Sequence, residues 1–161
     1  METINSLEEN KLPQGLNTLT ILTFIGCAIA YILGIFGFIN ADKSVTDLEK
    51  NMNNPDLPAF AKNMMTPEAL DNARIMATNK LPILIMGLIA TTLCLFGAIQ
   101  MRQRKLNGYY LWLTGEILPF ITAIIFINAA ATYKGYAIIG IVFALVFIIL
   151  YTMQRKYLTS K

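Results

Sequence analysis

The chain has 161 residues, of which 55% are hydrophobic and 14% charged, and its mean hydropathy is +0.53. This composition is too apolar for an ordinary soluble domain, and the chain is too short for most transporters, so we expect a small integral membrane protein. The net charge is only +3, and the absence of histidine removes the commonest general base and the commonest metal ligand.

The opening residues, METINSLEENKLPQG, are acidic rather than basic and carry no small-residue cleavage site. A secretory signal has the opposite charge and ends in such a site. We therefore expect the first apolar run to be retained as a membrane helix.

Four apolar runs reach or approach the roughly 20 residues that a helix needs to cross a bilayer. They are residues 16–39, 81–101, 109–131 and 136–153. The connections at 102–108 and 132–135 are short, so the second, third and fourth helices should be antiparallel neighbours. The prediction is an all-α fold, a four-helix transmembrane bundle that forms one membrane domain over residues 1–161.

The polar segment 40–80 separates the first two runs and carries helix signals of its own. Thr46 and Glu49 have the spacing of a capping box. Thr66, Pro67 and Glu68 supply an N-cap, a proline at the first helical position and an acid in the first turn. We expect two or three short amphipathic helices here, lying across the outer mouth of the bundle.

Basic residues set the predicted orientation, because positive flanks stay in the cytoplasm. The turn at 102–108 and the C-terminal tail both carry basic residues without any acid: Arg102, Arg104, Lys105, Arg155, Lys156 and Lys161. Both termini should then be cytoplasmic, with segment 40–80 outside, in the cytoplasmic (inner) membrane of a bacterium.

Glu116 is the only acidic residue within a strongly apolar run, and it lies next to Gly115 and shortly before Pro119. A carboxylate in hydrocarbon costs several kcal/mol unless it is paired, wetted or protonated. Pro119 also frees the carbonyl of Gly115, because proline has no N–H to donate. The run from 109 would place Glu116 about 10 Å inside the inner boundary.

Polar side chains of the same membrane half are the expected partners of Glu116. The candidate site comprises Glu116, Thr20, Thr23, Gln100 and Tyr151, with Thr152 nearby, in a pocket open or nearly open to the cytoplasm. Arg102, Arg104 and Lys105 could also reach Glu116 by snorkelling. Two interpretations stay open: a proton-titrating or cation-binding group, or a single acid that pins the fold by bonding a neighbouring helix.

Small residues recur every four positions, which permits close helix approach. The helix-packing residues are Gly26, Ala30 and Gly34 on the first helix and Gly140 and Ala144 on the fourth, with Ala90, Cys94 and Ala98 on the second. Packing within the monomer is the first explanation, and a self-association or partner-docking face is the alternative. Cys27 and Cys94 should act as small hydrophobes at different depths, without a disulfide.

No recognisable catalytic, metal-binding or phosphate-binding motif is present, so we expect no enzyme activity, no metal and no cofactor. The leading functional hypothesis is a non-enzymatic membrane protein that acts by association, as an accessory subunit of a membrane complex or a self-assembling unit. Its expected partners are membrane lipids and a membrane protein or a second copy, not nucleic acid. The alternative is a small carrier or channel in which Glu116 titrates or binds a cation.

Residues 12–26, LPQGLNTLTILTFIG, resemble the start of uncharacterised small four-span membrane proteins of Bacteroidota. In those proteins a proline and a glycine precede a run similar to LTILTFIG at the first helix. The resemblance implies a four-span membrane fold. It implies no particular activity.

Overall fold

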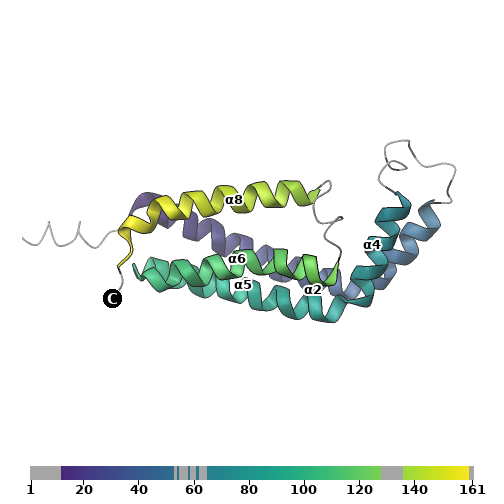
Figure 1. Cartoon of the computed structure of the whole chain (residues 1–161), viewed down its shortest axis with the longest axis horizontal. Helices are drawn as coiled ribbons and strands as arrows, with labels where there is room; N and C mark the ends of the chain where they lie inside the picture. Colours follow the sequence, from purple (N-terminus) through teal and green to yellow (C-terminus); the bar gives the residue numbers. More distant parts are fainter. Residues whose placement is uncertain are drawn as a thin grey trace, which may run out of the picture.

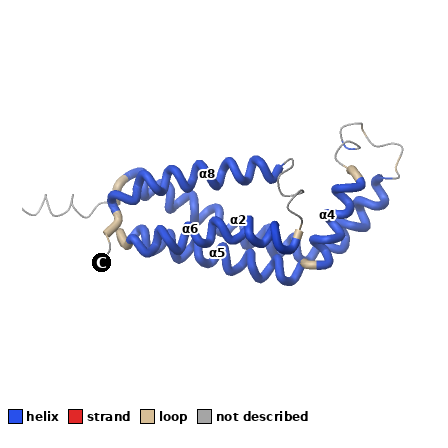
Figure 2. Tube along the Cα trace, in the orientation of Figure 1, coloured by secondary structure: helices blue, strands red, loops and turns tan. Residues whose placement is uncertain are grey.

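The computed structural model describes residues 12–52, 54, 58, 61, 65–127 and 136–159. Over these residues the chain is helical, and an isolated bridge between Lys105 and Thr159 is the only extended pairing (Figures 1 and 2). The all-α prediction is confirmed. The elements are α2 (Gln14–Met52), α4 (Pro67–Thr78), α5 (Lys80–Arg102), α6 (Leu106–Phe126), α8 (Tyr136–Gln154) and the 3₁₀ turn η1 (Arg155–Tyr157).

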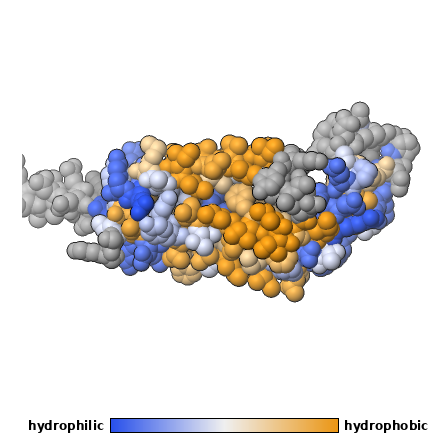
Figure 3. Space-filling view, viewed as in Figure 1, coloured by the Kyte–Doolittle hydropathy of each residue, from blue (hydrophilic) through white to orange (hydrophobic). Residues whose placement is uncertain are grey.

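Within the described residues, four helices are long and apolar enough to cross a membrane: α2, α5, α6 and the segment Ile138–Tyr157 that contains most of α8. Figure 3 shows apolar residues over the middle of the bundle and hydrophilic residues toward both ends. This distribution matches a hydrocarbon layer between two aqueous boundaries. The protein is therefore a multi-pass integral membrane protein, as its composition predicts.

The predicted bounds of the apolar runs agree closely with the observed bounds of α5 and α8, and less well with those of α6. Helix α6 begins at Leu106 rather than 109, because the turn after α5 is tighter than expected. Arg104 closes that turn with a positive φ of 59°. The predicted end of the third run at 128–131, the turn at 132–135 and Lys161 lie outside the described residues.

Helix α2 differs most from the prediction, since it runs without interruption to Met52 instead of ending at 39. Its 39 residues span about 58 Å, nearly twice the hydrocarbon thickness. The expected capping box at Thr46 is wrong. The Thr46 hydroxyl donates to the carbonyl of Asp42 at 3.2 Å, inside a continuing helix. Asn40 and Ser44 bond back to the preceding turn in the same way, so these polar residues do not cap a new helix.

Helix α4 begins where the sequence predicts. The Thr66 side chain accepts a hydrogen bond from the N–H of Ala69 at 3.2 Å, and Pro67 occupies the first turn. The position of α4 differs from the prediction, because it packs along the C-terminal part of α2 instead of covering the bundle mouth (Figure 1). We call α4 and residues 40–52 of α2 the arm.

An ion pair joins the two helices of the arm, and another joins the arm to the start of α5. The Arg74 guanidinium lies 2.6 Å from the Glu49 carboxylate, and the hydrogen bond and charge of Glu49 raise the pKa of Arg74. Lys80, at the start of α5, pairs with Asp42 of α2. Such exposed ion pairs contribute little to the free energy of folding, so their main effect is on the orientation of the arm.

The tightest helix contact lies between α5 and α6, where glycines remove the side chains that would separate the two backbones. A Cβ added at Gly97 would lie 2.5 Å from the amide nitrogen of Trp112, and one at Gly108 would lie 2.6 Å from the carbonyl oxygen of Gly97. A Cβ at Gly115 would meet the Ala90 carbonyl oxygen at 2.6 Å. This contact fixes the depth at which α6 presents Glu116.

The largest fully buried side chains gather toward one end of the bundle: Trp112, Tyr151, Leu16, Met101 and Thr20. We call this the basic end, because the turn after α5 and the chain after α8 add Arg102, Arg104, Lys105, Arg155 and Lys156. The Thr159 amide donates to the Arg104 carbonyl at 2.7 Å, and the Leu106 amide donates to the Thr159 carbonyl at 2.8 Å. The C-terminal segment thus fastens the turn between α5 and α6.

Candidate functional site

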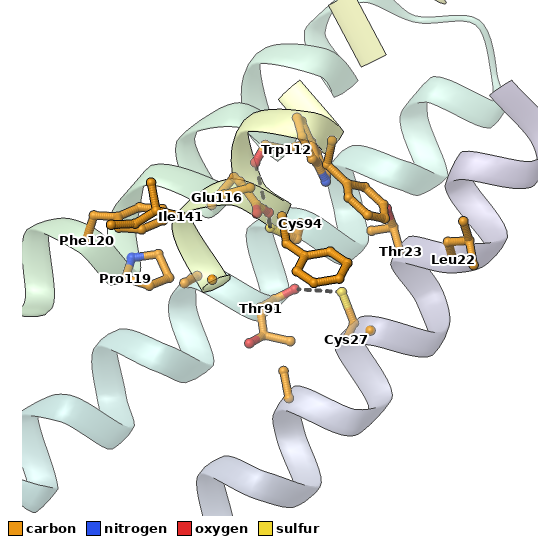
Figure 4. A pocket seen from close by; sticks show the side chains of 18 of the residues that line it. Leu22, Thr23, Cys27, Thr91, Cys94, Trp112, Glu116, Pro119, Phe120 and Ile141 are labelled. Atoms are coloured by element: carbon orange, nitrogen blue, oxygen red, sulfur yellow. Dashed lines mark hydrogen bonds between the residues drawn. The ribbon is translucent and has the colours of Figure 1, made fainter. Parts of the chain in front are cut away.

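A cavity of about 530 Å³ lies between α2, α5, α6 and α8, and Glu116 is the only acid among the described residues of its wall (Figure 4). Most of its wall is apolar or aromatic. Thr23, Thr91, Cys27 and Cys94 supply the remaining polar atoms. The aromatic side chains of the wall are Trp112, Phe120, Phe143 and Phe147.

The early start of α6 places Glu116 farther along its helix than the sequence predicts. Glu116 lies ten residues after Leu106, which corresponds to about 15 Å along the axis. It therefore lies at the middle of α6. Pro119 remains inside the helix one turn later and lines the same cavity.

Glu116 contacts the thiol group of a cysteine on the neighbouring helix α5. The sequence did not predict this partner. The Sγ of Cys94 on α5 lies 3.9 Å from Oε2 of Glu116 and 3.6 Å from the carbonyl oxygen of Trp112. A thiol is a weak donor and has one hydrogen to share between these acceptors. The half-buried carboxyl group is therefore only weakly satisfied by this contact.

The opposite wall joins α2 to α8 and α5. The hydroxyl groups of Thr23 and Tyr151 lie 2.7 Å apart, and Cys27 donates to the carbonyl oxygen of Thr91 at 3.7 Å. Figure 4 shows Thr23 and Cys27 on α2 across the cavity from Glu116. Both cysteines are free. Cys27 and Cys94 line the same cavity, Cys27 beside Thr91 and Cys94 about one turn farther along α5.

The predicted polar cluster divides into separate groups. Thr23 shares the cavity with Glu116, and Tyr151 reaches its edge through Thr23 and through ring contact with Trp112 at 4.3 Å between centroids. Thr20 instead accepts from Arg102 at 3.1 Å, and Asn17 accepts from the same guanidinium nitrogen at 2.9 Å. Arg102 is thus engaged with α2 and does not line the cavity of Glu116.

Gln100 and Thr152 also lie away from Glu116. Gln100 lines a shallow site with Tyr110 and Thr114, while Thr152 pairs with Tyr109 at 2.8 Å. One more polar contact escaped the sequence analysis: the Tyr31 and Thr92 hydroxyl groups meet at 2.7 Å between α2 and α5. Their residue types gave no signal, because isolated hydroxyls in apolar helices usually bond within their own helix.

The glycines of α2 and α8 do not make the expected close contacts. No described atom lies within 4 Å of a Cβ built at Gly26 or Gly140, and at Gly34 only the tip of Leu84 comes to 3.9 Å. Ala30 is exposed, whereas Ala144 is buried. Packing within the monomer therefore does not explain Gly26, Gly34 or Gly140. Close packing is instead made at Gly97, Gly108 and Gly115, with Ala90, Cys94 and Ala98 buried beside them.

A second cavity of about 570 Å³ lies between α2 and α5 and extends toward the arm. Gly34, Gly37 and Gly87 form part of its wall, and Lys80 and Ser44 lie at its polar end. Ala30, Ala90, Thr91 and Pro119 border both cavities. The small residues of α2 thus line open space along much of the span.

Comparison with family models, with curated proteins and with solved structures finds no match. The similarity of residues 12–26 to the Bacteroidota proteins remains a prediction.

Proposed function

We propose that this protein is a non-enzymatic membrane protein that works by associating with another transmembrane helix. The observation that supports the proposal is the unfilled face of α2 at Gly26, Ala30 and Gly34. A residue larger than glycine would fit at Gly26 and Gly34 in the monomer. Small residues at this spacing let a second helix approach closely, because van der Waals contact and not hydrophobicity drives association inside a bilayer.

The first partner that we propose is a second copy of this chain. A face with Gly26, Ala30 and Gly34 on one helix is complementary to itself, as a two-fold dimer requires. Ile25, Ile29 and Leu33 flank the face, and each is at least half exposed. A foreign subunit with a similar helix would use the same face, which would make the protein an accessory subunit.

Added bulk on this face tests the proposal. Ala30→Ile and Gly34→Ile should dissociate a dimer seen after gentle detergent extraction, while Ala28→Ile should not. Ala28 is also exposed on α2 but points to the opposite side. A wild-type protein that is monomeric and carries no other subunit would refute association, as would a dimer that tolerates both ridge variants.

The proposed location is the cytoplasmic membrane of a bacterium, with the basic end inside. Arg102, Arg104, Lys105, Arg155 and Lys156 at one end support it, because basic flanks remain in the cytoplasm. The start of α2 and the end of α8 lie at that same end (Figure 1). Both termini would then be cytoplasmic and the arm would lie outside.

The second candidate is a carrier or channel in which Glu116 titrates or binds a cation. The observation that favours it is the carboxyl group of Glu116 in a cavity at the middle of α6, where the weakly donating thiol of Cys94 contacts it at 3.9 Å. Glu116→Gln in reconstituted vesicles should abolish a pH-dependent flux while leaving the fold intact. Equal flux through both proteins would exclude this role for Glu116.

A further inference from the structure

Among its described residues, the wall of the cavity around Glu116 has an acidic group and no basic group to balance it. In the part of the wall that the structure describes, Glu116 is the only acid and no residue is lysine or arginine. The guanidinium of Arg102, which the sequence analysis offered as a partner, is bonded to Asn17 and Thr20 instead. An ionised carboxylate in such surroundings is costly unless a cation accompanies it. The wall therefore favours a ligand that brings its own positive charge.

The rest of the wall would fit an apolar group that is attached to the positively charged group of the ligand. Trp112, Phe120, Phe143 and Phe147 present aromatic surface, which attracts cations at its faces and apolar groups elsewhere. The volume of about 530 Å³ falls within the usual range of small-molecule sites, roughly 300–1,000 Å³. A small hydrated metal ion would leave most of this apolar space unfilled.

The position of two glycines indicates how such a ligand reaches the cavity. Gly26 on α2 and Gly140 on α8 both line it, both are exposed, and a Cβ at either would meet nothing within 4 Å. The two helices meet farther toward the basic end, at the bond between Thr23 and Tyr151. They therefore leave a lateral gap at the depth of Gly26, facing the acyl chains.

We propose that this cavity binds a lipophilic amine, with its ammonium group at Glu116 and its apolar body against the aromatic wall. The amine dissolves in the bilayer and passes between α2 and α8. Association through α2 is not required. A lipophilic amine is also the class of ligand that the carrier alternative would move. Binding of the amine without flux would exclude the carrier but would still agree with this site.

The protein contains one tryptophan, and it lines the cavity, so its emission reports on the site. The full-length protein is reconstituted in phosphatidylcholine vesicles, whose zwitterionic surface does not concentrate cations. Three probes share one body: 4-phenylbutylamine, the neutral 4-phenylbutanol and the anionic 4-phenylbutyrate. We expect a saturable change in Trp112 emission with the amine, binding at least about tenfold weaker for the alcohol, and no saturable change with the acid. Equilibrium binding of radiolabelled amine provides a readout independent of fluorescence.

Two variants test the two halves of the site. Glu116→Gln should weaken amine binding by at least about tenfold while leaving alcohol binding unchanged. Gly140→Leu fills the lateral gap but keeps the carboxyl group, so it should weaken binding of both probes. Gly87→Leu is the control, because Gly87 also has open space beside it but lies outside this cavity.

Equal affinity for the amine, the alcohol and the acid would overturn the proposal, as would the absence of saturable binding by both methods. Amine binding that survives both Glu116→Gln and Gly140→Leu would also overturn it. If Glu116→Gln does not fold, as judged by circular dichroism, Gly140→Leu and the three probes still decide. The oligomeric state of Glu116→Gln separates this result from the association proposal, because Glu116 lies on α6 and not on the α2 face, whereas Gly140 borders the gap beside Gly26.

Discussion

The hydroxyl groups of Tyr151 on α8 and Thr23 on α2 lie 2.7 Å apart and join the last helix to the first. The Tyr151 ring also lies against Trp112 of α6, with 4.3 Å between ring centroids. Tyr151 is fully buried. The Tyr151 side chain therefore links α2, α6 and α8 on the side of the cavity that is nearer the basic end. Farther from the basic end, α8 diverges from α2.

Tyr151→Phe should lower the free energy of unfolding by about 1 kcal/mol, because it removes one buried hydrogen bond and keeps the ring contact. The measurement is unfolding of the protein in mixed micelles by a denaturing detergent. Tyr157→Phe is the matched control, since Tyr157 is exposed in η1. Equal effects of the two variants would show that the bond to Thr23 contributes nothing measurable.

The sequence predicts the membrane architecture well because the rule that governs it is local. A helix must bury about 20 apolar residues in hydrocarbon, and each of the four runs carries that signal in its own composition. The length of α2 is different. Residues 40–52 contain neither glycine nor proline, so no residue breaks the helix, and packing against α4 decides that it continues. Capping signals such as Thr46 are ambiguous until the tertiary structure is known.

The sequence predicts one part of the candidate site, the acid, because that signal is also local. Glu116 stands out in the sequence because an acid in hydrocarbon needs an explanation. Its contact with Cys94 depends on how closely α5 and α6 approach, which Gly97, Gly108 and Gly115 set jointly. The rotation and the relative depth of the helices are properties of that packing, so the sequence alone could not show that Gln100 and Thr20 lie away from Glu116.

Gly115→Ala should destabilise the protein by about 1–3 kcal/mol, because the added methyl group would meet the backbone of α5 at Ala90 and Cys94. Gly87→Ala should be neutral or stabilising by up to about 1 kcal/mol, since alanine is the better helix former and space is open there. The detergent unfolding assay compares both with the wild type. A neutral Gly115→Ala would mean that α5 and α6 separate without cost.

Thr66→Ala should destabilise the start of α4 by about 1 kcal/mol, because Thr66 accepts the hydrogen bond of the Ala69 amide. Hydrogen exchange of the α4 amides measures this loss, with faster exchange in the first turn. Thr46→Ala provides the comparison. Thr46 donates within a continuing helix and caps nothing, so its loss should leave exchange in α2 unchanged. Faster exchange around Thr46 in that variant would restore the capping box that the structure excludes.

Gln103→Cys should react with a membrane-impermeant maleimide only from the cytoplasmic side, and Lys50→Cys only from the outside. Both positions are exposed, the first in the turn at the basic end and the second at the tip of the arm. The background replaces Cys27 and Cys94 by alanine so that each protein carries one thiol. Because α5 crosses the bilayer once between the two positions, the labels must fall on opposite sides in any single orientation. Reversed labelling would overturn the proposed orientation, and labelling of both positions from one side would contradict the crossing by α5 itself.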